Sequence, residues 1–133
     1  MRNRVLGWAV AFLAMDLVHD LDHVRRGNYS PGPVKVLGFL ALGGAILTIV
    51  LAGSRHRFAA PYAAFFGFTS AIGFVAVHVL PHWGPFSDPL QALHVDTFTW
   101  LIAAIDIVVA FGLGIAGVRE MNSEQPQPLQ SMP

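Results

Sequence analysis

Three long stretches with at most one charged residue each limit what this chain can fold into. They cover residues 36–54, 58–87 and 97–118, and Asp106 is the one interruption, in the third stretch. A helix needs about 20 mostly apolar residues to cross the hydrocarbon core of a bilayer. Each stretch is long enough for such a helix, so we expect an integral membrane protein.

The overall composition agrees with a membrane protein and excludes several classes of function. Only 12% of the 133 residues are charged, and the mean hydropathy is +0.56, whereas about 25% of the residues in a typical soluble domain are charged. Eight basic residues balance eight acidic ones, so we expect no nucleic-acid partner, because phosphate binding needs a basic excess. The chain has no cysteine, so any metal must be held by histidine and carboxylate side chains.

A fourth membrane span is expected near the N-terminus. The apolar run 5–15 is short and is followed by Asp16, Asp20 and Asp22, so the segment spans only if these acids face protein. A signal peptide is the alternative, but no A-x-A-like cleavage site follows the run. The expected fold is all-α, an integral membrane four-helix bundle over residues 1–119. Its helices are expected at about 4–26, 34–54, 58–82 and 90–118.

Two further expectations concern the ends of these helices. Asp88 followed by Pro89 is a favourable N-cap and first-turn pair for the fourth helix. Residues 120–133 are polar and contain three prolines, which predicts a disordered C-terminal tail.

The basic residues of the short loops predict the orientation in the membrane. Five of them fall at the end that carries both termini, and three fall at the other end. The five are Arg2, Arg4, Arg55, Arg57 and Arg119, and the three are Arg25, Arg26 and Lys35. Because cytoplasmic loops carry an excess of Lys and Arg, we expect both termini in the cytoplasm. The membrane is expected to be the inner membrane of a prokaryote.

Five of the six histidines fall near the opposite, outer end of the expected bundle. On the first helix, one stripe contains Asp16, His19, Asp20 and His23, because a helix advances about 100° per residue, whereas Asp22 points elsewhere. Apolar core residues normally occupy this i, i+3, i+4, i+7 pattern. Potential metal ligands thus lie on the face expected to contact the other helices.

The third and fourth helices are expected to add groups at a similar depth. His78 and His82 have the i, i+4 spacing that lets two imidazoles reach one ion. Pro81 makes His82 the less secure ligand, because proline can kink or end the helix just before it. Asp96 falls on the small and polar stripe predicted to face the bundle interior, about 160° from His94.

Together these groups predict a transition-metal site near the outer face, open to that side. Imidazole and carboxylate ligands suit zinc or iron, and there are enough of them for one ion or two. The candidate ligands are His19, His23, His78, His82, Asp16 and Asp96. The candidate catalytic residues are Asp20, as a general base, and Asp96. His94 and Asp106 are expected to support the ligands or relay protons, although Asp106 could instead clamp helices together.

The two H-x-x-x-H pairs, His19 to His23 and His78 to His82, resemble the histidine boxes of membrane di-iron hydroxylases and desaturases. The resemblance covers only these two pairs. Those families carry more histidines, usually including adjacent His-His pairs, which this chain lacks. The resemblance therefore supports metal binding by histidines but does not identify a reaction.

Four functional hypotheses follow from the sequence. The leading one is a metal-dependent hydrolase or oxidoreductase acting on a lipid-phase, interfacial or other small-molecule substrate. The second is a metal-ion or proton transporter in which Asp106 passes the ion inward. Because four helices are few for a carrier, such a transporter would need to form a homodimer. The third is a b-type cytochrome with a single haem, and the fourth is an accessory subunit of a membrane complex.

Overall fold

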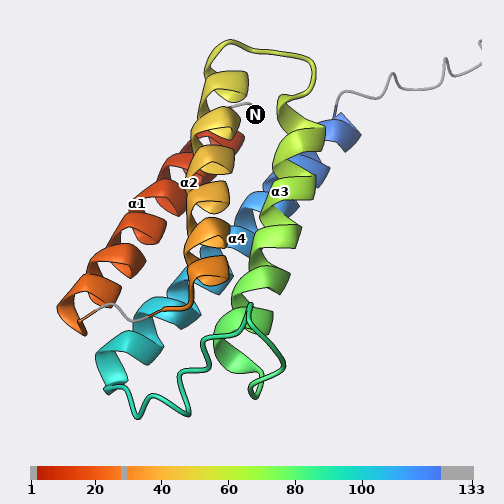
Figure 1. Cartoon of the computed structure of the whole chain (residues 1–133). Coiled ribbons are helices and arrows are strands. Elements are labelled where there is room, and N and C mark those ends of the chain that lie inside the picture. The colour runs from red at the N-terminus through yellow and green to blue at the C-terminus, as the bar shows by residue number, and fades with distance from the viewer. Residues whose placement is uncertain (1–2, 28–29, 124–133) are drawn as a thin grey trace, which may run out of the picture.

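A computed structural model describes residues 3–27 and 30–123, and within these ranges the regular secondary structure is helical throughout (Figure 1). Four α-helices and one π-helical turn follow one another along the chain. They are α1 (Asn3–Arg25), α2 (Gly32–Gly53), α3 (Ala59–Phe74), the π-helical turn η1 (Val75–Val79) and α4 (Thr97–Ser123).

The four helices form a bundle in which neighbours along the chain run in opposite directions (Figure 1). The start of α1, the α2–α3 loop and the end of α4 lie at one end of the bundle, and the long α3–α4 connection lies at the other. α4 packs against both α3 and α1, and α2 packs mainly against α1. Groups near the end of α1 and near the start of α4 therefore meet at the end where the α3–α4 connection lies.

Three helical segments are long and apolar enough to cross a membrane. They are Gly32–Gly53, Ala59–Val79 and Thr97–Ser123. Large apolar side chains such as Phe39 and Leu40 on α2 are exposed along these segments, as expected where lipid rather than water surrounds a helix.

Small residues allow α3 and α4 to approach closely. A methyl group added at Gly67 would lie 2.3 Å from the backbone nitrogen of Gly114. One added at Gly117 would lie 2.4 Å from the backbone nitrogen of Ala64. Glycine and alanine at helix contacts let two backbones come together inside a membrane, so the backbones of α3 and α4 are in direct contact at these positions.

The expected start of the fourth helix at about residue 90, with Asp88 as its N-cap and Pro89 in its first turn, is wrong. The segment after η1 instead folds back over it. The backbone N–H of Asp88 donates to the carbonyl of Val77 at 2.8 Å, and the N–H of Leu90 donates to the carbonyl of His78 at 3.0 Å. α4 consequently begins only at Thr97.

The other end of α4 also differs from the expectation. The helix continues to Ser123, and Glu120, expected to open a disordered tail, is buried in its last turns. The rest of the expected tail, residues 124–133, lies outside the described residues.

The helix that carries His78 ends at Val79, three residues before the expected bound at residue 82. The N–H of Leu80 donates to the carbonyl of Val75 at 3.0 Å, an i to i+5 bond that makes the last turn π-helical. Leu80 itself is extended, with φ −71° and ψ 152°, because a residue before proline avoids the helical region. His82 therefore lies outside the helix.

Candidate metal centre

Three imidazoles from two separate parts of the chain meet at the end of the bundle where the α3–α4 connection lies. They belong to His19 and His23, one turn apart on α1, and to His78 on η1, and one ring nitrogen of each lies within 4.8 Å of the other two. The ring centres of His19 and His78 are 4.8 Å apart, and those of His23 and His78 are 5.7 Å apart. This cluster confirms that a metal ion could be held here, with imidazoles as its ligands.

The spacing of the nitrogens suits coordination. Nε2 of His19 lies 3.0 Å from Nε2 of His23. Two nitrogens bound to one tetrahedral zinc, each at 2.0–2.1 Å, are separated by about 3.3 Å. His19 and His23 are thus already at ligand spacing, and His78 would have to approach by at most about 1.5 Å from the 4.8 Å limit.

The other ring nitrogen of His19 and of His78 faces a hydrogen-bond acceptor. Nδ1 of His78 donates to the backbone carbonyl of Asp88 at 3.2 Å. Nδ1 of His19 lies 3.5 Å from Oδ2 of Asp106, longer than an ordinary N–H···O bond. A proton on Nδ1 leaves Nε2 free to bind a metal, and such partners normally fix the orientation of metal-bound histidines.

His23 has two alternatives for its proton. Ser30 Oγ lies 3.1 Å from Nδ1 of His23 and donates to Oδ2 of Asp88 at 2.6 Å, so Ser30 can accept a hydrogen bond from a protonated Nδ1. An Arg26 nitrogen lies 3.2 Å from the same Nδ1, and a guanidinium can only donate. The contact with Ser30 favours the metal-binding tautomer, whereas the contact with Arg26 favours a proton on Nε2, shared with His19.

Two carboxylates lie farther into the bundle than the histidine cluster. Asp106 is fully buried and Asp16 is 3% exposed, and among the described residues neither oxygen of Asp106 nor Oδ2 of Asp16 has a hydrogen-bond partner. An unpartnered buried carboxyl group is costly. A metal ion bound to Nε2 of His19 would stabilise the negative charge of Asp106, because the imidazole would lie between the ion and this carboxylate.

Asp96 does not join the cluster, although the sequence placed it among the ligands and the catalytic groups. It is exposed and precedes α4, where its Oδ1 accepts the backbone N–H of Thr99 at 2.9 Å. Arg25, the last residue of α1, lies 2.9 Å from its Oδ2. The Thr99 N–H and the Arg25 guanidinium lower the pKa of Asp96, so it stays ionised and ties α1 to α4.

Asp22 points away from the histidines, as expected, but toward α4 rather than toward lipid. Its carboxylate accepts hydrogen bonds from Arg25 at 2.8 Å, from Arg26 at 2.9 Å and from the hydroxyl of Thr99 at 2.8 Å. α1 packs against both α2 and α4, so its buried surface is wider than the single stripe predicted from sequence.

The remaining predicted groups lie outside the cluster. Asp20 is exposed, and a methyl group on Gly38 of α2 would lie 4.0 Å from its Oδ1. His82 is exposed in the loop after Pro81, with its Nδ1 3.0 Å from Ser87 Oγ. His94 is exposed and has φ 49°, in the left-handed region.

A pocket of about 430 Å³ opens beside the cluster, a size typical of small-molecule sites. Its lining includes His23 and His94 and is otherwise mainly polar and charged: Arg26, Ser30, Asp88 and Asp96, with Leu93 and Val95. His94 thus lies at the mouth of the site rather than among the ligands. A polar molecule in this pocket can therefore reach the cluster at His23.

Sequence reasoning missed Ser30 and Asp88 as site residues. Both lie in loops, where no periodic pattern marks an inward-facing position, and Asp88 was assigned to a helix cap. Their contact joins the α1–α2 loop to the α3–α4 connection, and only tertiary structure brings these two loops together.

No known family model, curated protein or solved structure matches this chain.

Proposed function

We propose that this chain is a membrane metalloenzyme that binds one transition-metal ion, zinc or iron, through His19, His23 and His78. The observation that carries the proposal is the convergence of three largely buried imidazoles from two separate parts of the chain. Imidazole is the ligand that both metals accept most readily in the absence of thiolate. Two of the imidazoles also have an acceptor at Nδ1 that orients Nε2 inward.

The proposed arrangement in the membrane has four spans. Besides the three apolar segments, α1 crosses with its buried acids facing α4 and the cluster. Both termini lie in the cytoplasm, following the excess of arginine at that end. The metal site then faces the outside of a prokaryotic inner membrane.

The proposed reaction is hydrolysis of a lipid-phase or interfacial substrate. Three protein ligands leave at least one coordination position open, where a metal activates water or polarises a substrate oxygen. Asp106 would hold the ring of His19, and the Asp88 carbonyl would hold that of His78. The polar pocket next to His23 would admit the substrate headgroup.

Binding of azide to the cobalt-loaded protein tests for an open coordination position. Cobalt(II) replaces zinc and reports its coordination by visible absorption, so we expect azide to shift these bands in the wild-type protein. The same shift is expected in a His56→Ala control, because His56 is an exposed residue of the α2–α3 loop at the opposite end. A cobalt spectrum that does not respond to azide would indicate a closed structural site and contradict the enzyme proposal.

Transport of a metal ion or a proton is the second candidate. It is favoured by one observation, the unpartnered carboxylates Asp16 and Asp106, which lie on the inner side of His19 and could receive an ion from the cluster. A haem is less favoured, because the three rings contact one another directly, and a porphyrin would have to separate two of them.

An Asp106→Asn substitution distinguishes the enzyme from the carrier. Loss of a carboxylate that supports a metal-bound histidine typically weakens metal binding by about 10–100-fold. An enzyme should therefore regain its metal at higher metal concentration, measured by titration of the purified protein. A carrier should lose uptake into liposomes even when the outer site is saturated, and uptake retained by the variant would exclude the carrier.

A further inference from the structure

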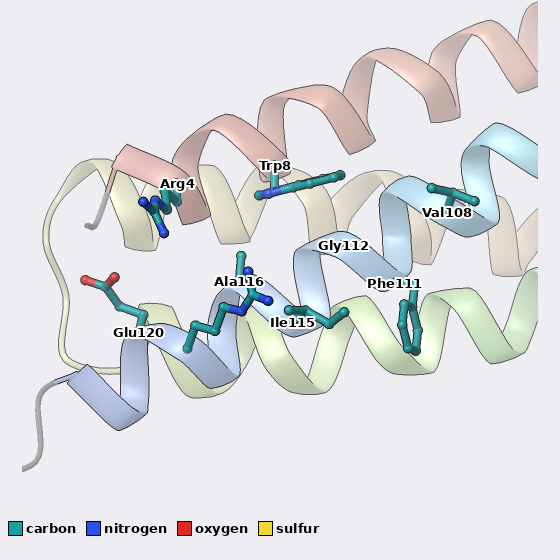
Figure 2. Close-up of a pocket in the computed structure, with 9 residues that line it drawn as sticks. Arg4, Trp8, Val108, Phe111, Gly112, Ile115, Ala116 and Glu120 are labelled. Atoms are coloured by element: carbon teal, nitrogen blue, oxygen red, sulfur yellow. The ribbon is translucent and has the colours of Figure 1, made fainter.

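A second pocket lies at the far end of the bundle from the histidines, between α1 and α4. It has a volume of about 300 Å³. Figure 2 shows Arg4 and Glu120 at its terminal end and Trp8, Ile115 and Val108 following toward the middle of the bundle. The pocket is therefore a groove that is charged at one end and apolar along its length.

The groove has the length of one membrane leaflet. Val108 and Glu120 are twelve residues apart on α4, or about 18 Å at 1.5 Å per residue. The hydrocarbon of one leaflet is about 15 Å thick, half of the bilayer core. A groove of this length, beginning at the helix ends, matches a lipid whose headgroup lies at the helix ends and whose acyl chain runs inward.

The depth of the groove depends on a glycine. A methyl group on Gly112 would lie 2.4 Å from the ring of Trp8, so the indole lies directly over this position on α4. Because Gly112 has no side chain, the ring can lie against the backbone of α4 and form an apolar wall of the groove.

The charged end of the groove favours an anion. Arg4 and Arg119 both line it, and both are exposed. Within the described part of the chain, neither arginine forms an ion pair. Glu120 lines the same end, so two positive charges face one negative charge, and a guanidinium binds phosphate oxygens strongly.

We propose that this groove binds an anionic phospholipid, with the phosphate at Arg4 and Arg119 and one acyl chain along Trp8, Ile115 and Val108. The proposal rests on α1 and α4 lying in the membrane and is independent of the metal site. A lipid in this position would fill the space between α1 and α4 and stabilise their contact.

Native mass spectrometry of lipid binding tests the headgroup. We expect the wild-type protein in detergent to bind phosphatidylglycerol about fivefold more tightly than phosphatidylcholine with the same acyl chains, the effect of one net basic charge. The double variant Arg4→Gln, Arg119→Gln should lose this preference, and Glu120→Gln should increase it. The control variant Arg55→Gln, Arg57→Gln removes the same charge from the α2–α3 loop at the same end of the bundle. This control should keep the preference for phosphatidylglycerol.

Three results would overturn this part of the proposal. They are equal binding of the two lipids by the wild-type protein, an equal loss of preference in the control variant, and displacement of phosphatidylglycerol by an equal concentration of inorganic phosphate. The last result would show a site for a free anion instead of a lipid.

A second pair of variants tests the acyl-chain groove. Val108 is 63% exposed and Val50, on α2, is 57% exposed, so tryptophan is tolerated sterically at either position. Val108→Trp should fill the groove and weaken binding of phosphatidylglycerol severalfold, whereas Val50→Trp should leave it unchanged. Equal binding by the two variants would show that the acyl chain does not lie in this groove.

Discussion

Replacing His19 by alanine is expected to weaken metal binding by more than about 100-fold, beyond the loss typical of a residue that only supports a ligand. His19 offers Nε2 to the ion beside Nε2 of His23, and its Nδ1 faces Asp106. The substitution therefore removes one of the three proposed ligands and also the ring nitrogen that lies 3.5 Å from Oδ2 of Asp106. Metal content of the purified protein, measured by mass spectrometry after dialysis, gives the result.

Two variants keep this prediction independent of folding. His78→Gln removes a ligand but keeps a polar side chain of similar size, and it should lose the metal as well. His56→Ala, in the exposed loop at the opposite end, should bind metal as the wild type does. If His78→Gln folds, as judged by its helical circular dichroism, and keeps its full metal content, the proposed ligand set is wrong.

The largest effect on stability is expected from Gly67→Ala. A methyl group there would lie 2.3 Å from the nitrogen of Gly114 and 2.7 Å from the carbonyl oxygen of Ala110. Both atoms belong to the backbone of α4, so α3 and α4 must move apart. We expect the free energy of unfolding to fall by about 2–3 kcal/mol, the usual cost of overpacking.

Gly73→Ala, on the same helix, is the matched control. Nothing lies within 4 Å of a methyl group at Gly73, and alanine stabilises a helix interior relative to glycine by up to about 1 kcal/mol. Unfolding of both variants by denaturant in the same detergent micelles measures the difference. Similar stabilities of the two variants would show that the close α3–α4 contact does not limit the bundle.

The helical fold and the three helices that are long and apolar enough to cross a membrane could be predicted because they depend on local sequence. Long apolar stretches specify helices in a bilayer whatever their neighbours are. The pairing of His19 with His23 was predictable for the same reason, because an i, i+4 spacing brings two side chains together within one helix. Pro81 marked where the helix carrying His78 could end, although the expected bound, residue 82, lies three residues beyond the observed end at Val79.

The start of α4 could not be predicted, and the wrong placement of Asp96 followed from it. Asp88 and Pro89 have the sequence of a helix cap, but backbone hydrogen bonds to η1 hold this segment as a loop. Asp96 therefore precedes α4 and does not face the interior of the bundle. With α4 starting at Thr97, Asp106 lies about 14 Å along the helix, and its Oδ2 lies 3.5 Å from Nδ1 of His19.

The partners of the histidines depend on tertiary structure alone. Ser30 lies seven residues beyond His23, and Asp88 ten residues beyond His78, each in a loop without periodicity. Their positions follow from the packing of α1 against its neighbours and from the fold of the α3–α4 connection. The sequence therefore indicated the chemistry of the site, and the structure was needed to find what holds it in place.

X-ray absorption spectroscopy of the zinc-loaded protein tests the central claim most directly. The account predicts three imidazole nitrogens at about 2.0 Å, together with one oxygen ligand from water or substrate. The spectrum should lose one imidazole in His78→Gln. Zinc surrounded only by oxygen, or by fewer than two imidazoles in the wild-type protein, would contradict the account, because the three histidines would then meet for a purpose other than metal binding.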